Sequence, residues 1–461
     1  MINDILGIDL GTSSVKLFLK NKNGMKKARE SYSSASPDGW WSALCKAAKS
    51  LDLSGVKAVG LSSQVGTYII NKEKTLPWNC GEGKEELDLI LSDLSQDFFK
   101  KEISMPHPKI ISYPLPRIKH IISREPDVKS ICMPKDLTCE KLTGNLVSDK
   151  FSWRGIANLI TCKYSKELLS YIGAEENILP ELCEPTSLAG YVTHKAYLET
   201  SIPEGTAVII GCNDFFAGLI GMGINSTGDM FDITGTSEHL GILESDREKD
   251  DNLVFGKYFF ANAHYGVTAS SGKSLTFGES FCNLNDVDID SALSKNPPIF
   301  LPYLCGERAP VWDMDARGVF FGINAEASPH EMAYAVLEGV AFSIYHIYET
   351  MGKPKAKFIT VAGGAAQNST LNLIKASLFD IPVCVCRESD TSAFGAAILA
   401  AVGIGAYHSL EDAANEAREY SSRTEPSMPL SYKLKRRYEI YKSLYPVLKD
   451  QFKKLKQEEL Q

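Results

Sequence analysis

Two short stretches decide the fold of this chain: Gly7–Ser13, with the sequence GIDLGTS, and Phe231–Ser237, with the sequence FDITGTS. Each has an Asp shortly before a Gly-Thr-Ser element in an apolar run, which predicts the tip of a β-hairpin. Such a tip suits phosphate, because Gly lets the backbone approach closely, successive N–H groups can surround an anion, and two hydroxyls add donors. The pair, about half the chain apart, predicts two lobes that clamp one polyphosphate. For either copy alone, an ordinary turn is the simpler interpretation.

Composition and charge narrow the function classes. The 461 residues allow about two or three domains, and 44% hydrophobic with 23% charged residues is typical of globular proteins. A net charge of −8, from 49 basic and 57 acidic residues, argues against a nucleic-acid partner or an anionic membrane. An anionic nucleotide would then need backbone N–H groups and a metal ion as partners.

Targeting signals and cysteine usage predict a cytoplasmic protein. The amino terminus has no basic leader, and the longest late apolar stretch, 395–406, is too short to span a bilayer. The eleven cysteines include no C-x-x-C pair. Cys384 and Cys386 would share one face of a strand, where we expect packing rather than metal binding. The chain is therefore expected to be reduced and cytoplasmic, without a membrane partner.

The apolar pattern predicts alternating strands and helices. Short apolar runs predict strands in the first half at 5–10, 15–19, 56–61, 68–70 and 206–211, with a helix at 42–49. The region 78–200 is richer in charge and Pro, so we expect helices and loops there. In the second half we expect a hairpin at 230–243, a helix at 329–351 and a strand at 358–361. From residue 431, an apolar stripe predicts a terminal helix that packs back across the first lobe rather than on a membrane.

The first hairpin contains two candidate ligand groups. Asp9 is a candidate Mg²⁺ ligand, directly or through water, because Mg²⁺ beside ATP phosphates takes carboxylate oxygen. An Asp that caps the hairpin is the alternative. Lys16, on the returning strand, either reaches the phosphates or faces solvent.

Asp214 is the candidate catalytic residue. It follows the carboxyl end of a buried strand and begins a helix, which is where ligands gather in α/β sheets. As a general base it would accept the proton of an attacking hydroxyl during phosphoryl transfer. A helix N-cap is the alternative role.

Two further glycine-containing segments are candidates for nucleotide binding. Gly363 and Gly364 follow a strand, and with Asn368 they would let the backbone lie against a flat ring such as adenine; a plain turn is the alternative. The segment 269–274 is similar to a P-loop. The preceding glycine, Gly266, is one residue too far away and no clear strand precedes the segment, so we reject a P-loop.

The segment Gly318–Glu338, GVFFGINAEASPHEMAYAVLE, fits the second signature of the FGGY carbohydrate kinases at every constrained position. The segment 300–310, FLPYLCGERAP, resembles the xylulokinase branch of that family, as do Trp40-Trp41 and the PKDL sequence at 134–137. The resemblance covers nearly the whole chain. It implies two actin-like (ribonuclease H-like) α/β lobes with a central cleft for nucleotide and sugar.

The resemblance also implies roles for single residues. Asp214 matches the catalytic base of the family and Asp9 its magnesium-associated Asp. The positions that contact ATP are matched by Gly11, Thr12, Ser13, Gly235, Thr236, Gly272, Thr276, Gly364 and Asn368. The implied activity is phosphoryl transfer from ATP, with Mg²⁺, to an alcohol group.

Departures from the family pattern concern the sugar. Xylulokinases usually carry Gln-Met-His-Gly where this chain has Gln64-Val65-Gly66, and an Asn where Phe215 follows Asp214. Cys80 replaces the Asp of a Trp-Asn-Asp element, and Arg117 replaces a Lys. We therefore expect a rebuilt sugar pocket with these residues: Gln64, Val65, Trp78, Asp214 and Phe215.

The sequence thus predicts an ATP-dependent kinase with a sugar-binding lobe at 1–224, a nucleotide-binding lobe at 225–429 and a terminal helix at 430–461. The acceptor is expected to be a ketose, aldonate or polyol, with D-xylulose as one candidate. The alternatives are a gluconate or other polyol kinase, a non-catalytic sugar- or ATP-sensing relative, and an ATPase that needs no sugar. A homodimer is compatible with the sequence.

Overall fold

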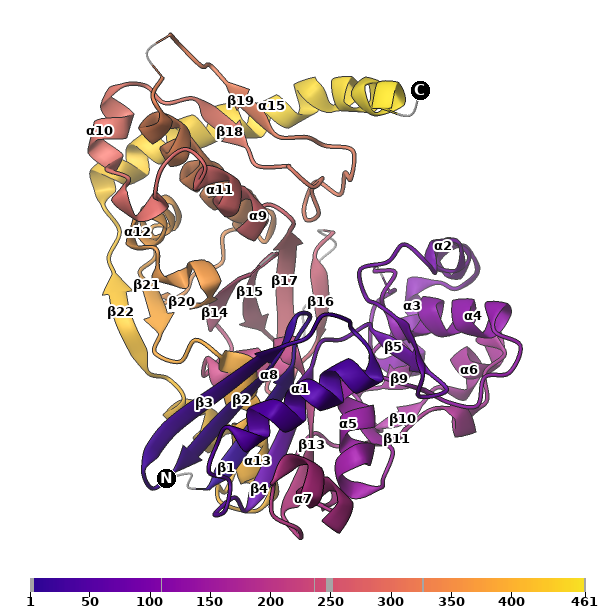
Figure 1. The fold of residues 1–461 in the computed structure, drawn as a ribbon. Helices are drawn as coiled ribbons and strands as arrows, with labels where there is room; N and C mark the ends of the chain where they lie inside the picture. The colour runs from indigo at the N-terminus through magenta and orange to yellow at the C-terminus, as the bar shows by residue number, and fades with distance from the viewer. Residues whose placement is uncertain (1–3, 109, 236, 246–251, 326, 460–461) are drawn as a thin grey trace. The chain divides into compact units, whose positions relative to one another are not determined.

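The chain forms two compact α/β units in the computed structural model, which describes residues 4–108, 110–235, 237–245, 252–325 and 327–459. The first unit contains the chain up to Asn225, with Gly256–Phe259 and Asp390–Ala417. The second contains Ser226–Phe255, Phe260–Ser389 and the chain from Arg418 onward. Each unit combines a sheet with helices (Figure 1), so the predicted α/β class is confirmed.

The first unit is built on a sheet with the strand order β12-β13-β4-β1-β2-β3. Its strands are β1 Ile5–Leu10, β2 Ser14–Asn21, β3 Gly24–Ser31, β4 Ala58–Ser63, β12 Leu188–Tyr191 and β13 Ala207–Asn213. β1 pairs antiparallel with β2 and parallel with β4, and β4 pairs parallel with β13. The continuous apolar runs of β1 and β4 are buried along their whole length, as is typical of parallel strands. The carboxyl ends of β1, β4 and β13 share one edge of the sheet.

Two helices from distant parts of the sequence pack on this sheet. α1 (Pro37–Lys49) contacts β2 and β3, and α13 (Thr391–Gly403) contacts β1 and β4. A Cβ on Gly7 would lie 1.9 Å from the Ala393 carbonyl oxygen, so α13 approaches the strand at a distance that only glycine allows. This close packing places α13, with α14 (Leu410–Glu416), in the first unit, whereas the sequence predicted a single lobe at 225–429.

Short helices and small sheets form the rest of the first unit. The helices within 78–200 were predicted from the charge and Pro content, but the short strands there were not. The helices are α2 Lys84–Asp93, α3 Gln96–Ile103, α4 Pro114–Arg124, α5 Pro134–Thr143, α6 Lys166–Ile172, η1 Glu176–Ile178, α7 His194–Thr200 and α8 Asp214–Gly221. The strands are β5 Tyr68–Ile70, β6 Lys74–Leu76, β7 Ile131–Cys132, β8 Val147–Asp149, β9 Ala157–Asn158, β10 Lys163–Tyr164 and β11 Glu181–Cys183.

The second unit has a sheet with the strand order β16-β17-β15-β14-β20-β21-β22. Its strands are β14 Met230–Thr234, β15 Glu238–Glu244, β16 Val254–Lys257, β17 Asn262–Thr268, β20 Ile359–Gly363, β21 Val383–Cys386 and β22 Tyr420–Thr424. β14 pairs antiparallel with β15 and parallel with β20, so its neighbours are of the same two kinds as those of β1.

Helix α11 (Pro329–Thr350) forms the centre of the second unit and is buried along most of its length. The other elements are α9 Gly272–Gly278, η2 Leu284–Asp286, α10 Ile289–Ser294, β18 Ile299–Leu301, β19 Val319–Phe321, η3 Gly364–Gln367, α12 Ser369–Phe379 and α15 Met428–Glu459. Among the helices of the described residues, none is both long enough and apolar enough to cross a membrane.

The terminal helix α15 packs on α11 and α12 of the second unit (Figure 1). The expectation that it crosses the first lobe is wrong. Its anchor is Arg437, whose guanidinium donates to both carboxylate oxygens of the buried Glu338 at 2.6 and 2.7 Å. The hydroxyl of the buried Tyr441 lies 3.0 Å from that of Tyr303. These polar partners lie far away in the sequence, so the apolar stripe alone does not identify the packing surface.

Candidate active site

Asp214 is the first residue of α8 and directly follows β13. Asn213 caps the helix, since its side chain accepts a hydrogen bond from the Phe216 N–H at 2.9 Å. The N-cap alternative for Asp214 is therefore wrong. Asp214 Oδ1 instead accepts a hydrogen bond from the N–H of Phe215 at 2.8 Å.

Poor hydration and a neighbouring charge set the protonation of Asp214. The residue as a whole is only partly buried, but its carboxyl group lies where water has little access. Burial, followed by the negative charge of Asp9, raises the pKa of Asp214 to about 7. A backbone hydrogen bond and the cations Arg154 and Lys16 act in the opposite direction. A carboxylate that titrates near neutrality is suited to general-base catalysis.

Asp9 lies near Asp214 because of the strand register. Asp9 of β1 is paired with Ser62 of β4, and Ser62 with Cys212 of β13, two residues before Asp214. The Ser62 hydroxyl donates to Asp9 Oδ1 at 3.0 Å. Burial raises the pKa of this carboxyl, while Lys16 and Ser62 lower it. Asp9 is part of the strand and not of the turn, so the hairpin-capping alternative is wrong.

The residues around Asp9 suit Mg²⁺ better than a metal ion whose ligands are all protein side chains. Among the residues that the structure describes, no cluster of three or more His, Cys, Asp or Glu could hold a metal ion. Mg²⁺ usually binds through one or two carboxylates and substrate phosphates and keeps several waters. The Asp9 carboxylate is a donor of this kind.

The first Gly-Thr-Ser element forms the three-residue tip between β1 and β2. The Gly11 N–H donates to the Ser14 carbonyl at 3.0 Å, which closes the turn as predicted. Thr12 and Ser13 are exposed. Their hydroxyls are therefore accessible to a ligand.

Lys16 lies opposite Asp9 in the register, but its ammonium contacts a different carboxylate. Lys16 Nζ is 3.2 Å from Asp390 Oδ1, and Lys27 Nζ is 3.5 Å from Asp390 Oδ2. Asp390 directly precedes α13, so only the fold brings it to this hairpin. The structure thus adds a third arrangement to the two that the sequence suggests for Lys16.

Three of the predicted sugar residues, Gln64, Val65 and Trp78, occupy loops of the first unit that contact each other, and Asp214 and Phe215 begin α8. The buried Gln64 follows β4, and its N–H donates to the Leu10 carbonyl at 3.0 Å. In the same loop as Gln64 and Val65, Thr67 accepts a hydrogen bond from the Trp78 N–H at 3.1 Å. The sequence did not single out this threonine, which connects the two loops.

Arg117 and Cys80 explain two of the departures from the family pattern together. The fully buried Arg117 donates to the carbonyls of Trp78 and Cys80 at 3.2 and 3.0 Å. Its Nη1 lies 2.6 Å from the Cys80 sulfur. The guanidinium therefore fixes the loop that contains Trp78. The sequence contains one sign of this contact: Cys80 and Arg117, the two partners, both depart from the family pattern.

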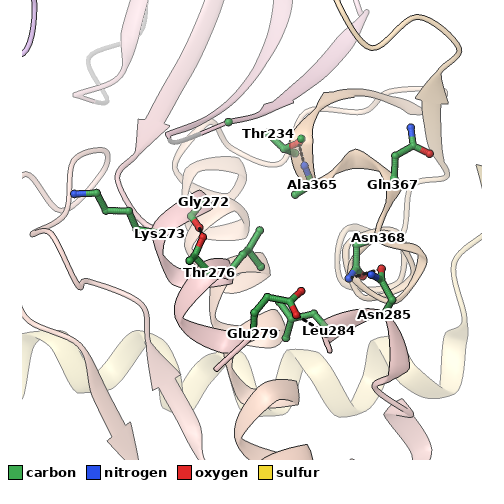
Figure 2. A pocket seen from close by; sticks show the side chains of 13 residues that line it. Thr234, Gly272, Lys273, Thr276, Glu279, Leu284, Asn285, Ala365, Gln367 and Asn368 are labelled. Carbon is green, nitrogen blue, oxygen red and sulfur yellow. Dashed lines mark hydrogen bonds between the residues drawn. The ribbon is translucent and has the colours of Figure 1, made fainter. Parts of the chain in front are cut away.

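A pocket of about 620 Å³ lies in the second unit. It is lined by five residues that the sequence predicted to contact nucleotide: Gly235, Gly272, Thr276, Gly364 and Asn368. Figure 2 shows Gly272, Thr276 and Asn368 at the pocket. The sequence did not single out the other lining residues: Thr234, Lys273, Leu275, Glu279, Leu284, Asn285, Ala365 and Gln367. Thr236, also predicted to contact nucleotide, lies outside the described residues.

Thr234 ties the second tip to the turn after β20. Its hydroxyl donates to the Ala362 carbonyl at 3.1 Å and accepts from the Ala365 N–H at 3.1 Å. Gly363 has a φ of 103°, and a Cβ there would lie 2.0 Å from the Thr234 carbonyl oxygen. The close approach of the two segments therefore requires glycine at this position.

The pocket combines apolar walls with polar side chains that are already oriented. Asn368 Oδ1 accepts from the Leu371 N–H at 2.7 Å, and its Nδ2 donates to Asn285 Oδ1 at 3.3 Å. The Thr276 hydroxyl donates to the Gly272 carbonyl at 2.9 Å. With leucine and alanine side chains around them, these groups suit a flat heterocycle that has polar edges.

The segment 269–274, for which the sequence rejected a P-loop, does follow a strand, β17. The expectation that no strand lies there is wrong, because Asn, His and Gly residues interrupt the apolar pattern of β17. The Ala269 N–H donates to Glu307 Oε1 at 2.9 Å, and the Gly272 N–H to the Gly235 carbonyl at 3.1 Å. These backbone donors are used within the protein, which supports the rejection of a P-loop.

Family models match most of the chain. The model of the N-terminal domain of the FGGY family of carbohydrate kinases matches residues 4–221, and that of the C-terminal domain matches residues 216–404. The chain is 27% identical to the xylulose kinase of Bacillus subtilis strain 168, over 97% of both chains.

Solved structures show the same fold. A ligand-bound xylulose kinase from Lactobacillus acidophilus matches with a TM-score of 0.84 at 20% identity, over 98% of this chain and 100% of that one. A gluconate kinase from the same organism matches with a TM-score of 0.83 at 20% identity, over 98% and 99%. The chain therefore belongs to the FGGY family of carbohydrate kinases and is an ATP-dependent phosphotransferase with an alcohol group as acceptor.

Proposed function

We propose that the chain phosphorylates a hydroxyl of a small ketose, aldonate or polyol, with Asp214 as the general base. The observation that carries this proposal is the position of Asp214 at the start of α8. There Asn213 supplies the helix cap and burial raises the pKa of Asp214 to about 7. Asp214 would accept the proton of the acceptor hydroxyl as the phosphoryl group is transferred. A base of this kind typically contributes about 10²- to 10⁴-fold to the rate.

The second unit would bind ATP in the pocket that contains Gly272 and Gly364. Two features support this role: the close approach of Gly363, next to Gly364, to Thr234 in the pocket wall, and apolar walls beside fixed amide and hydroxyl groups. The exposed tip formed by Gly11, Thr12 and Ser13 would contact phosphate oxygens through backbone N–H and hydroxyl groups.

Asp9 would hold Mg²⁺, through its carboxylate or a bound water. When bound, the ion neutralises the negative charge of the phosphates. The position of Asp9 near Asp214, which follows from the register through Ser62, supports this assignment. Mg²⁺ would also offset the negative charge of Asp9 that raises the pKa of Asp214, as Lys16 does in part.

The first unit would bind the acceptor through Gln64, Val65, Trp78 and Phe215. The loops that contain Gln64, Val65 and Trp78 are joined by Thr67, and Arg117 fixes the Trp78 loop. D-xylulose stays one candidate, because the similar Bacillus subtilis protein is a xylulose kinase. We further propose a cytoplasmic location, since all eleven cysteines are free thiols.

A coupled ADP-release assay with a panel of ketoses, aldonates and polyols tests this function. Asp214→Asn should lower kcat by roughly 10³-fold and leave ATP affinity unchanged in calorimetry. The matched control, Asp97→Asn, changes an exposed carboxylate of the same unit and should have no effect. Full sugar-dependent turnover in Asp214→Asn would disprove the assignment of the base. Sugar binding without any turnover would favour a sensing role.

The pH dependence provides a second test. Asp214 acts as a base only when ionised, and its pKa is raised to about 7. We therefore expect kcat/KM of the free enzyme to fall about tenfold per pH unit below that value and to level off above it. A profile that is flat down to pH 5 would show that another group accepts the proton.

A further inference from the structure

Arg154 is a buried cation beside the proposed sugar residues of the first unit. The residue is only 8% exposed, and its guanidinium carbon lies 5.4 Å from the ring centres of both Tyr113 and Phe216. Phe216 belongs to α8, two residues after Asp214, and Tyr113 directly precedes α4. Arg154 thus lies between the helix that begins with the base and the segment in front of α4.

The segment in front of α4 packs against the loop 64–67. A Cβ on Gly66 would lie 2.7 Å from the Cβ of Ser112, so the two backbones are in direct contact there. Ser112 is the chain neighbour of Tyr113, whose ring lies against Arg154. The guanidinium therefore contacts α8 just after Asp214 on one side. On the other side it contacts a segment that packs against the loop containing Gln64 and Val65.

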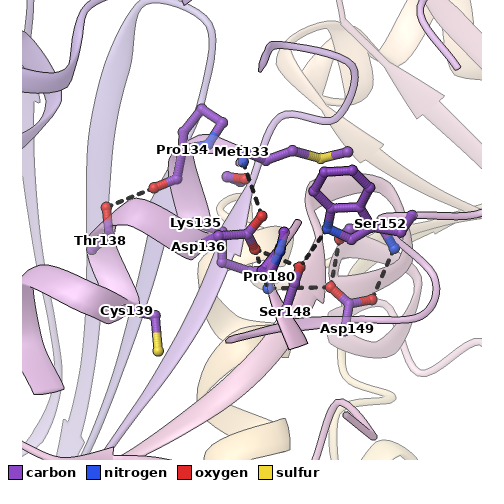
Figure 3. Close-up of polar contacts among 12 residues, drawn as sticks. Met133, Pro134, Lys135, Asp136, Thr138, Cys139, Ser148, Asp149, Ser152 and Pro180 are labelled. Carbon is purple, nitrogen blue, oxygen red and sulfur yellow. Dashed lines mark hydrogen bonds and ion pairs between the residues drawn. The ribbon is translucent and has the colours of Figure 1, made fainter. Parts of the chain in front are cut away.

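A buried polar network fixes the backbone on the N-terminal side of Arg154 (Figure 3). Asp149 Oδ1 accepts hydrogen bonds from the N–H groups of Phe151 and Ser152, both at 2.9 Å. Figure 3 shows Asp149 beside Ser152. The indole N–H of Trp153 donates to a serine hydroxyl of the same network at 2.9 Å. Since the residues that precede it are anchored, Arg154 is positioned before any ligand arrives.

The other proposed sugar residues supply few polar groups. Val65 and Phe215 are apolar, Trp78 is aromatic, and Gln64 is a neutral amide. A guanidinium adds a planar set of N–H donors that matches a carboxylate with two parallel hydrogen bonds. Such charge-assisted bonds are roughly twice as strong as neutral ones. Arg154 therefore changes the kind of acceptor that this site recognises.

We propose that the acceptor is an aldonate, a sugar acid whose carboxylate binds the Arg154 guanidinium. The inference rests on the proposed function, because it names the acceptor class of that same site. An aldonate has its carboxylate at one end of the carbon chain and a primary hydroxyl at the other. One molecule can thus meet a cation at one end and a catalytic base, Asp214, at the other. An alditol or ketose of equal length lacks the charged end.

The first test uses the wild-type protein with three acceptors of equal carbon number: an aldonate, its neutral aldonamide and the corresponding alditol. Five- and six-carbon series are compared in the ADP-release assay. We expect kcat/KM for the aldonate to exceed both neutral values by roughly 10- to 100-fold, as for a hydrogen-bonded ion pair. Equal or higher values for the neutral acceptors would overturn the proposal.

Variants then assign the preference to the guanidinium. Arg154→Met should lower kcat/KM for the aldonate roughly 10- to 100-fold and change the alditol value by less than about 3-fold. Arg154→Lys, which keeps the charge but loses the planar fork, should give an intermediate loss. The control Lys150→Met removes a nearby cation that pairs with Glu184 at 2.7 Å, and should leave the ratio unchanged. Equal losses for both acceptors would mean that Arg154 only tunes Asp214.

Calorimetry separates a failure of this inference from a failure of the proposed function. If no acceptor is turned over, the kinase assignment fails, but aldonate binding that disappears in Arg154→Met still supports the carboxylate site. If alditols or ketoses are phosphorylated and aldonates neither bind nor react, the kinase assignment holds and the aldonate inference is wrong. Retained ATP binding shows that Arg154→Met is folded.

Discussion

The two hairpins with Gly-Thr-Ser tips share a strand plan but use their acidic residues differently. In each, the first strand has an antiparallel hairpin partner and a parallel neighbour from later in the chain. Asp9 lies two positions before Gly11, whereas Asp232 lies three positions before Gly235. Side chains alternate between the two faces of a strand, so the two aspartates point to opposite faces relative to the tip.

The surroundings of the two aspartates differ accordingly. Asp9 accepts from Ser62 at the sheet edge near Asp214, and the lysine opposite it pairs with another carboxylate. Asp232 shares the ammonium of Lys375 with Glu238, and all three groups are buried. An acidic residue before such a tip is therefore a candidate metal ligand only at the correct position in the alternation. At the other position, that of Asp232, the carboxylate forms buried ion pairs in the protein interior.

The largest effect that tests this contrast is expected for Lys375→Met. It would leave Asp232 and Glu238 buried without their cation, which typically costs about 3–5 kcal/mol of unfolding free energy. Urea unfolding measures the change, and the exposed Lys449→Met is the matched control.

The pH dependence of Lys375→Met sharpens the same test. Burial and Glu238 already raise the pKa of Asp232 well above its ordinary value. A carboxyl with a raised folded-state pKa destabilises the fold increasingly as pH rises above the unfolded value. The variant should therefore lose more stability at pH 8 than at pH 5. A loss below about 1 kcal/mol at both would contradict the structural role of this cluster.

Asp9→Asn is expected to lower kcat roughly 100-fold, as for the loss of an electrostatic group at a transferring phosphoryl. Stability should be unchanged or increased, because burial raises the pKa of Asp9 and the neutral amide avoids a poorly hydrated charge. Turnover as a function of Mg²⁺ concentration and urea unfolding measure the two effects. Asp232→Asn should leave the Mg²⁺ requirement unchanged, because the Asp232 carboxylate pairs with the buried Lys375. Exchanged phenotypes would refute the contrast between the hairpins.

The smallest effect is expected for Lys16→Met. Its ammonium pairs with Asp390 at 3.2 Å on a partly exposed surface, where such pairs contribute little. We expect KM for ATP to rise less than about 5-fold. Lys27→Met, which removes the other partner of Asp390, is the control. A rise of about 100-fold in Lys16→Met alone would show that Lys16 binds the phosphates, as the sequence also allowed.

Local pattern was enough to predict much of the fold. Continuous apolar runs identify β1 and β4, since parallel strands are buried on both faces. The helical period identifies α11, and its capping box of Ser328 and Glu331 marks its start. Asp214 was predicted as a base from its place between a strand and a helix. The structure removes the N-cap alternative through the neighbouring Asn213.

Contacts between distant segments could not be predicted. Asp390 reaches Lys16 only because α13 returns to the first sheet, and Arg437 identifies the surface for α15 only through the buried Glu338. Strand β17 was missed because its polar residues and Gly266 hide the apolar pattern. For Asp390 and Arg437, the deciding interaction joins residues whose spacing in the sequence carries no periodic signal.

The return of α13 to the first sheet has a consequence for biosynthesis. Gly7 and Gly60 leave room for a helix backbone that emerges from the ribosome only after most of the chain has been translated. The first sheet is thus synthesised early but receives α13 only near the end of translation. Until then, the apolar face that α13 covers is exposed. A truncated chain ending at Asn225 would keep that surface open to water, which makes it prone to aggregation and a natural client of chaperones.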